Sequence, residues 1–357
     1  MTPLARADLP LVSVIVPAYN EGSVLDASLT ALWDHCQTLT SYRFELLVVD
    51  DGSTDDTAEV ADAFAARRPG SVLVHHLPLN QRLGGALRAA IPLTRGTWVL
   101  TYDADLSYDV HHVEQLLDAL ERTACRVVLA SPYAPGGRSV GVPRKLHTRS
   151  RLANAWLGLA AQGNIKTLTG LVRGYDGRWL RTVSLKAEDV DVNVELVYKA
   201  QLLRAGVVEV PAVLDWSRIG TRATRSHIFS RRERWNVYKA LVNGFVFRPF
   251  LFPLVPGVGL LVLGALLFSV SAGVSKPALL GAVCLVVGSF LCWQSLPLLQ
   301  AKRYFEESFN QGDRVLGALR ATEEQALLPL GAAVGAPRPL HREAAVPARA
   351  PTGSPER

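Results

Sequence analysis

The sequence predicts an α/β protein with a largely parallel, doubly wound sheet, followed by a helical hairpin of membrane-spanning length. Two observations predict this fold. Up to about residue 230, short β-branched runs alternate with helical patterns, and two uncharged apolar runs follow within residues 250–299. Strands that alternate with helices form parallel sheets, which gather ligands at the carboxyl ends of their strands. We therefore expect a ligand site at that edge of the sheet.

The composition is that of a folded protein and excludes a wholly disordered chain. Of the 357 residues, 49% are hydrophobic and 20% are charged. The net charge of +6 suits phosphate-bearing ligands or an anionic membrane surface. The four cysteines form no Cys-x-x-Cys pair and no cluster with histidine at metal spacing. We therefore expect neither a disulfide framework nor a structural zinc site.

The predicted strands and helices alternate regularly through the first zone. We expect strands at 12–16, 44–49, 72–76, 98–102 and 126–130, and helices at 22–36, 55–67, 83–93 and 110–122. The apolar run that opens this zone, Leu11 to Val16, is too short for the core of a signal peptide, so the first domain should stay in the cytoplasm. No Gly-x-Gly-x-x-Gly motif follows the first strand, which disfavours a dinucleotide-dependent dehydrogenase.

The two apolar runs, Phe250–Val270 and Pro277–Leu299, each have the length of a transmembrane helix. The alternative is a pair of buried core helices, but two such runs in succession are hard to bury in a domain of this size. A short loop, Ser271 to Lys276, joins them, so they should form a hairpin with both ends on one side. Basic residues are more frequent on both flanks than in the loop, which places the first domain and the tail in the cytoplasm.

These zones define the expected domains. Residues 1–225 form the first domain, 226–249 an interfacial amphipathic helix, 250–299 the hairpin and 300–357 a cytoplasmic tail, largely disordered from about residue 325. The interfacial helix is predicted because basic residues there mix with aromatic ones. An ordinary basic surface helix is the alternative.

Polar motifs follow the first two predicted strands. Pro17-Ala18-Tyr19-Asn20-Glu21 comes after the first strand, and the second ends in Asp50-Asp51-Gly52-Ser53. Asp51 can accept a hydrogen bond from a ribose or a base, while the helix start after it can donate backbone N–H groups to an anion. A simple helix cap is the alternative interpretation.

Two further acids, Asp103 and Asp105, follow the strand that ends near Tyr102. They lie on the same side of an extended chain, where like charges repel unless a cation neutralises them. A hard divalent metal such as Mg²⁺ or Mn²⁺ is the simplest explanation, because it prefers carboxylate oxygens and can stabilise a leaving diphosphate. The alternative is a solvated acidic turn.

With these motifs the chain resembles the inverting glycosyltransferases of the GT-A fold, in particular the polyprenyl-phosphate and dolichol-phosphate sugar transferases. The resemblance extends from about Leu11 to Gly220, and the hairpin matches the subgroup that carries membrane anchors. It implies a Rossmann-like GT-A catalytic domain that moves one sugar from a nucleotide sugar, such as GDP-mannose or UDP-glucose, to a polyprenyl phosphate. Asp103 and Asp105 would then be the catalytic metal ligands.

The resemblance also implies a donor site. Its members would be Pro17, Tyr19, Glu21, Asp51, Arg82, Gly84, Asp103 and Glu195. Gly84 and Gly85 lie in a segment similar to the family's Gly-rich stretch, where they would let the backbone approach the ligand, and Arg82 or Arg88 would meet phosphate. A plain turn is the alternative there, and a charge cluster at a helix start is the alternative for Glu195.

The acceptor phosphate would bind elsewhere. The implied residues are Ser131, Arg138, Arg144, Thr148 and Arg218. Arg144 and Thr148 share a helical face at i, i+4, for which a basic face toward the membrane is the alternative. Two departures from the family pattern stand out. Pro132 occupies the place of an arginine, for which Arg138 is the candidate substitute, and Lys166 stands where many relatives have an acid, so Lys166 receives no catalytic role.

Two other functions were weighed. A processive polysaccharide synthase is suggested by Arg231-Arg232-Glu233-Arg234-Trp235, which partly matches a Gln-x-x-Arg-Trp motif, but the glutamine is absent and two spans are too few for a polymer channel. The intact Asp103 and Asp105 speak against a catalytically silent membrane scaffold. We expect a membrane as partner and no nucleic acid, and a homo-oligomer stays open.

Overall fold

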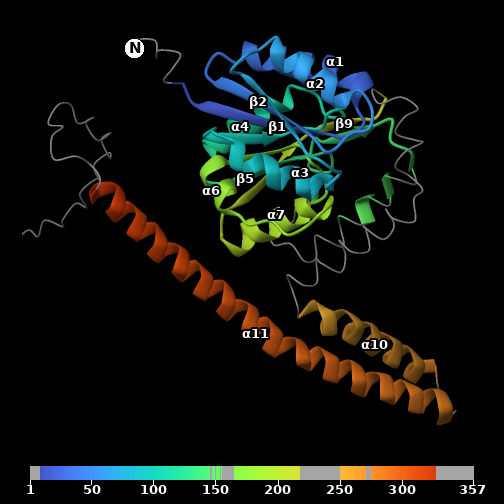
Figure 1. The fold of residues 1–357 in the computed structure, drawn as a ribbon. Coiled ribbons are helices and arrows are strands. Elements are labelled where there is room, and N and C mark those ends of the chain that lie inside the picture. The colour runs from blue at the N-terminus through green and yellow to red at the C-terminus, as the bar shows by residue number, and fades with distance from the viewer. Residues whose placement is uncertain are drawn as a thin grey trace, which may run out of the picture. The chain divides into compact units, whose positions relative to one another are not determined.

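The computed structural model describes residues 9–144, 147–148, 150–152, 154, 165–217, 250–270 and 275–326 (Figure 1). Arg218, the expected interfacial helix at 226–249 and the tail beyond Ala326 lie outside the described residues.

A seven-stranded sheet forms the centre of the first domain, in the order β3-β2-β1-β4-β7-β5-β8. Its strands are β1 (Leu11–Ala18), β2 (Arg43–Asp50), β3 (Val72–His76), β4 (Trp98–Thr101), β5 (Val127–Ser131), β7 (Arg173–Asp176) and β8 (Val207–Pro211). All neighbours pair in parallel except β7, which runs antiparallel to both β4 and β5. The predicted largely parallel sheet is therefore confirmed, with β7 as the departure. The strands β6 (Arg138–Val140) and β9 (Val213–Asp215) form a separate two-stranded parallel sheet.

Helices cover both faces of the sheet, α1 and α2 on one side and α3, α6 and α7 on the other (Figure 1). They are α1 (Gly22–Thr38), α2 (Thr57–Ala66), α3 (Arg82–Ala90) with the 3-10 turn η2 (Ile91–Leu93), α4 (His112–Arg122), α6 (Gly177–Thr182) and α7 (Asp191–Leu202). Successive residues of β1 point to opposite faces: Val14 packs in the cluster with α1, α2 and α4, and Ile15 in the cluster with α3, α6 and α7. Burial on both faces explains why β1 and β2 are mostly apolar inside the sheet; the buried exceptions Ser13 and Glu45 are paired, since the Ser13 hydroxyl donates to Glu45 at 2.6 Å.

The antiparallel strand β7 matters for the site. Arg173 at its start pairs with Thr101 at the end of β4. Because β7 runs against its neighbours, the segment that leads into it reaches the edge of the sheet at which the parallel strands end. Residues before β7 therefore join the loops that follow β1, β2 and β4.

Two long apolar helices follow, α10 (Leu251–Val270) and α11 (Ser275–Ala326). Both are long and apolar enough to cross a membrane, over Phe252–Val270 and Lys276–Ala301. Only 17% and 22% of the residues in the two apolar windows are buried, whereas a core helix of a soluble protein would be mostly buried. α11 continues past the apolar part, so residues 301–326 are helical as well.

Glycines bring α10 and α11 together. A Cβ atom on Gly257 would lie 3.0 Å from the carbonyl oxygen of Gly288, and one on Gly264 would lie 2.8 Å from that of Gly281. Gly257 and Gly264 are seven residues apart on α10, and Gly281 and Gly288 are seven residues apart on α11. Seven residues are about two helical turns, so the two glycines of each helix lie on one face. The hairpin is therefore antiparallel and closely packed through small residues, as is common between helices in lipid.

Candidate active site

A cavity of about 420 Å³ lies at the carboxyl ends of β1, β2, β4 and β5. The strand order β2-β1-β4-β7-β5 divides its polar lining into two sides. The carboxylate side, from the loops after β1, β2 and β4, contains Glu21, Asp51, Asp103 and Asp105, together with the hydroxyl groups of Tyr19, Ser107 and Tyr108. The hydroxyl side, from the segments around β5 and β7, consists of Tyr133, Ser150, Thr167 and Thr169. No lysine or arginine is among the described residues that line the cavity.

The loops after β1 and β2 brace each other. The side-chain oxygen of Asn20 accepts a hydrogen bond from the Thr54 backbone N–H at 2.8 Å, and the backbone N–H of Glu21 donates to the Thr57 hydroxyl at 2.8 Å. Asn20 has a φ of 57°, a left-handed conformation that asparagine tolerates better than most residues. The predicted strand-end motifs thus form one hydrogen-bonded rim, in which Pro17, Tyr19 and Glu21 line the cavity.

Asp51 lies in this rim and is 4% exposed. Its carboxylate accepts a hydrogen bond from the Gln81 N–H at 2.7 Å, at the start of α3. Burial raises the pKa of Asp51, although the N–H groups of Gln81 and Arg82 act in the opposite direction. The side chain is therefore a fixed hydrogen-bond acceptor at the cavity wall, which suits a ribose or base donor.

Asp103 and Asp105 both line the cavity, as predicted. Burial, and then the negative charge of Asp105, raise the pKa of Asp103 above its ordinary value. Ser107 holds the pair, donating its hydroxyl to Asp103 at 3.3 Å and its backbone N–H to Asp105 at 2.9 Å. No ion pair of either acid with a basic side chain is found in the described part of the chain. Two close carboxylates without a cationic partner fit a divalent cation.

The chain itself supplies few metal ligands. Among the described residues no group of three or more His, Cys, Asp or Glu side chains could hold a metal ion. Mg²⁺ commonly binds through one or two carboxylates, with substrate phosphates and water completing its coordination. The donor set therefore fits a metal that binds together with a diphosphate, and it does not fit a metal held by protein alone.

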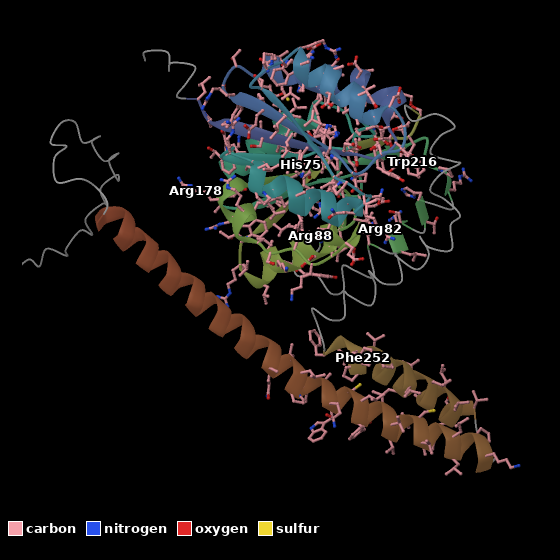
Figure 2. All side chains as sticks on the ribbon, viewed as in Figure 1. His75, Arg82, Arg88, Arg178, Trp216 and Phe252 are labelled. Carbon is pink, nitrogen blue, oxygen red and sulfur yellow. The ribbon has the colours of Figure 1, made fainter. Side chains whose placement is uncertain are left out.

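The structure gives the Gly-rich segment a different role from the one expected. A Cβ on Gly84 would lie 2.1 Å from the carbonyl oxygen of Ala187, and the Gly84 N–H donates to the Glu188 carbonyl at 3.0 Å. Arg82 faces Asp189 at 3.7 Å, and Arg88 donates to the Ala187 carbonyl (both arginines are labelled in Figure 2). The close approach that Gly84 permits is thus to the segment before α7. Neither Gly84 nor Arg82 lines the cavity.

Glu195 also serves the fold. It is 5% exposed, and its carboxylate accepts from the backbone N–H groups of Lys186 and Ala187 at 2.8–3.1 Å. Lys199 lies 2.5 Å from the same carboxylate, one turn later on α7. With both oxygens engaged and no place in the cavity lining, Glu195 fixes the turn before α7, and we do not carry it into the donor site.

Of the acceptor candidates, none that the structure describes lines the cavity. Ser131 is buried and shares a hydrogen bond of 2.6 Å with the Thr167 hydroxyl. Arg138 is exposed in β6, where it pairs with Val213 of β9. Arg144 and Thr148 are exposed and are neighbours at i, i+4, since the Thr148 hydroxyl donates to the Arg144 carbonyl at 3.0 Å. Arg218 lies outside the described residues.

The hydroxyl side contains two groups that the sequence did not single out, Ser150 and Thr169. The Tyr133 hydroxyl donates to Ser150 Oγ at 2.8 Å. The amide nitrogen of Asn154, a residue that is 2% exposed, approaches Ser150 Oγ at 3.4 Å and Thr169 Oγ1 at 3.5 Å. Because both hydroxyl oxygens already face donors, their own hydrogens remain for a ligand that accepts. An anion is such a ligand. The i, i+4 spacing of Ser150 and Asn154 was the sequence feature that could have indicated that these two polar side chains lie together.

Arg173, which the sequence analysis did not single out either, lies beneath the hydroxyl side, in contact with residues that line the cavity. It is 1% exposed, and it donates to the backbone carbonyls of Gly170, Asn193 and Leu168 at 2.7, 2.6 and 2.6 Å. Burial lowers the pKa of its guanidinium. The described residues give it no carboxylate within ion-pair distance, so its charge is balanced by carbonyl dipoles next to the cavity.

Comparison with known proteins agrees with this geometry. Residues 13–183 match the family described as Glycosyl transferase family 2. An undecaprenyl-phosphate mannosyltransferase of Micrococcus luteus is 34% identical over 215 residues, which cover 58% of this chain and 85% of that protein. The chain belongs to glycosyl transferase family 2. Its first domain is a glycosyltransferase domain with the GT-A-like sheet that the strand-end motifs predicted.

Other glycosyltransferases are similar over the same share of the chain. A polyprenol monophosphomannose synthase of Mycolicibacterium smegmatis is 32% identical over 213 residues, covering 58% of this chain and 78% of that protein. The glycosyltransferase AglD of Haloferax volcanii is 28% identical over 217 residues, again 58% of this chain. The matched region spans 33% of the length of AglD.

Proposed function

We propose that this chain transfers a single sugar from a nucleotide sugar to a polyprenyl phosphate at a membrane surface. The observation that carries the proposal is one cavity that combines a nucleoside rim, a carboxylate pair for a metal and a side of donating hydroxyls. The named substrates of the mannosyl-transferring relatives support the same acceptor class. The donor belongs to the GDP-mannose or UDP-glucose class.

The carboxylate side would hold the donor. Tyr19 and Asp51 frame the nucleoside, and Asp103 and Asp105 bind Mg²⁺ or Mn²⁺ together with the diphosphate. When bound, this metal supplies Lewis-acid stabilisation of the leaving nucleoside diphosphate. Ser107 keeps the two carboxylates oriented, through its hydroxyl to Asp103 and its backbone N–H to Asp105.

The hydroxyl side would hold the acceptor phosphate. Ser150 and Thr169 can each donate a hydrogen bond to it, and the buried charge of Arg173 lies behind them. A phosphate monoester with a second pKa of about 6 is already largely ionised at neutral pH. Its oxygen can therefore attack the anomeric carbon without a general base, and the main task of the site is to bring two anions together.

The hairpin of α10 and α11 would anchor the domain beside its lipid substrate. We place both ends of the hairpin in the cytoplasm, because the flanks carry more basic residues than the connecting loop. Cysteines introduced at Ala240 and Lys302 should be labelled from the same side of sealed vesicles. Labelling from opposite sides would overturn this topology.

The function is tested by incubating membranes that contain the protein with labelled GDP-mannose or UDP-glucose and extracting lipids. We expect one sugar on an acid-labile lipid phosphate, no such product from Asp103→Asn, and full product from Asp34→Asn, which changes an exposed acid on α1. A labelled polymer would favour a processive synthase. The absence of product with every sugar nucleotide would favour a silent scaffold.

A further inference from the structure

Asn193 is a buried polar residue on the cavity that the proposed function does not use. It lies in the first turn of α7, lines the cavity and is 1% exposed. Its backbone N–H donates to the Val190 carbonyl at 3.1 Å, and its backbone carbonyl accepts from Arg173 at 2.6 Å. The residue is thus held from both sides of its main chain.

The orientation of the Asn193 amide is fixed by its surroundings. Its Nδ2 donates to the carbonyl oxygen of Thr169 at 3.1 Å. Turning the amide over would place two oxygens against each other, so the nitrogen must face Thr169. The remaining polar atom, Oδ1, is buried and has no hydrogen-bond partner among the described residues.

An unsatisfied buried amide oxygen costs about 1–3 kcal/mol, so a native site normally provides a donor for it. An ionised phosphate cannot be that donor, because its oxygens only accept, and neither can a carboxylate. A sugar hydroxyl can. We propose that Asn193 is a specificity-determining residue whose Oδ1 accepts a hydrogen bond from a hydroxyl group of the transferred sugar. The inference rests on the proposed function and names one contact of its donor site.

The position of Asn193 suits this role. Its partner Arg173 pairs with Thr101, and Asp103 follows two residues later on the carboxylate side. Its other partner, Thr169, belongs to the hydroxyl side. Asn193 therefore connects the two sides, and the transferred sugar must lie between the diphosphate on one and the acceptor phosphate on the other.

A buried water molecule is the rival donor to Oδ1, since such waters commonly satisfy orphan polar groups. A water would serve only the fold. The two explanations differ in what a truncation of Asn193 does to the binding of sugar nucleotides compared with free nucleoside diphosphates, because only the former carry the sugar.

The experiment measures, by calorimetry on the full-length protein with Mn²⁺, the affinity for the sugar nucleotide that is turned over and for its nucleoside diphosphate. Asn193→Ala should weaken the binding of the sugar nucleotide about tenfold, which is the scale of one neutral hydrogen bond. The affinity for the nucleoside diphosphate should be unchanged. Asn193→Gln, which keeps both an amide N–H for the Thr169 carbonyl and an acceptor oxygen, covers the case in which the alanine variant is unstable. It should discriminate against the deoxy-sugar donor as the wild type does. Gln201→Ala, later on α7 and away from the cavity, is the matched control.

Deoxy-sugar nucleotides identify the hydroxyl. Wild-type protein should bind one deoxy analogue about tenfold more weakly than the parent sugar nucleotide, and Asn193→Ala should bind the two equally. Equal losses for sugar nucleotide and nucleoside diphosphate, or no loss for either, would show that Oδ1 does not accept a hydrogen bond from the transferred sugar and would overturn the inference. Normal sugar-nucleotide binding without any lipid product would overturn the proposed acceptor. The proposed contact of Asn193 would then be decided by the measured affinities alone.

Discussion

The two sides of the cavity are built in different ways. The carboxylate side comes from short motifs that directly follow three parallel strands, and hydrogen bonds from neighbouring backbone and hydroxyl groups hold Asp51, Asp103 and Asp105. The hydroxyl side comes from segments that are distant in the sequence, connected by hydrogen bonds of the buried Asn154 and Arg173 and of the half-buried Glu209. The first side therefore presents negative charge to a ligand, whereas the second depends on hydrogen bonds within the domain to position its hydroxyl groups. Changes on the first should affect turnover, and changes on the second should affect stability and acceptor binding.

The largest effect is expected from Asp105→Asn. The substitution removes one of the few anionic ligands available to a diphosphate-bound cation, so turnover should fall below detection while thermal unfolding stays near that of the wild type. Transfer rates in washed membranes, measured with and without EDTA, check this. Wild-type transfer that EDTA does not diminish would contradict the metal assignment.

The opposite pattern is expected for Arg173→Met. Three backbone carbonyls would lose their donor inside the domain, so the free energy of unfolding should fall by about 3 kcal/mol or more. Arg173→Lys keeps the charge but cannot reach all three carbonyls, so its free energy of unfolding should lie between that of the wild type and that of Arg173→Met. Thermal unfolding of the detergent-solubilised protein measures both. A melting temperature unchanged by Arg173→Met would show that these carbonyls do not depend on the guanidinium.

Acceptor binding tests the hydroxyl side directly. Ser150→Ala and Thr169→Val each remove one donor to an anion, and each should raise the apparent KM for lipid phosphate about tenfold, with little change in the KM for the donor. Arg144→Ala is the comparison, because Arg144 is exposed and does not line the cavity. If Arg144→Ala raises the lipid KM more than Ser150→Ala does, the acceptor clamp lies outside the cavity, as the sequence first indicated.

The same contrast explains what the sequence could predict. Asp51, Asp103 and Asp105 stand at strand ends, and the alternation of strands and helices is enough to bring strand ends to one edge of a sheet. The strands β1 to β5, the approximate bounds of α1 to α4 and the strand-end positions of the acids followed from this local pattern, whereas no bounds were predicted for β7, β8, α6 and α7. The short β7 was not foreseen as antiparallel, because nothing in Arg173–Asp176 alone fixes the direction of its neighbours.

The hydroxyl side could not be predicted in the same way. Its residues are arranged by hydrogen bonds between segments far apart in the chain, such as that from the Leu168 N–H to Asn154. Gly84 and Glu195 show the converse case, in which the structure gives contacts within the fold and the role in the donor site stays a prediction. Both have the chemistry of ligand-binding residues, yet tertiary packing against residues 186–188 uses them for the fold.

The smallest effect concerns His76, which supports the carboxylate side from β3. Its two ring nitrogens lie 3.1 Å from Asp50 and 3.1 Å from Asp62, and Asp50 in turn accepts from the Ser53 N–H at 3.0 Å. The hydrogen bond to Asp50 is the largest cause of a raised pKa of His76. A raised pKa means that the protonated ring stabilises the folded state. That contribution is fully present below the ordinary histidine pKa of about 6.5 and is lost as the pH rises through the higher folded value.

His76→Gln should therefore remove part of the fall in stability of the wild type between about pH 6 and pH 8. Because the side chain of His76 is 41% exposed, solvent screens the pair, and the difference should stay below about 1 kcal/mol. Thermal unfolding at several pH values measures it. His75→Gln is the matched control, since His75 is the adjacent residue of β3 and successive side chains of a strand point to opposite faces. An equal change in pH dependence for both variants would mean that the loop after β2 does not depend on the contact between His76 and Asp50.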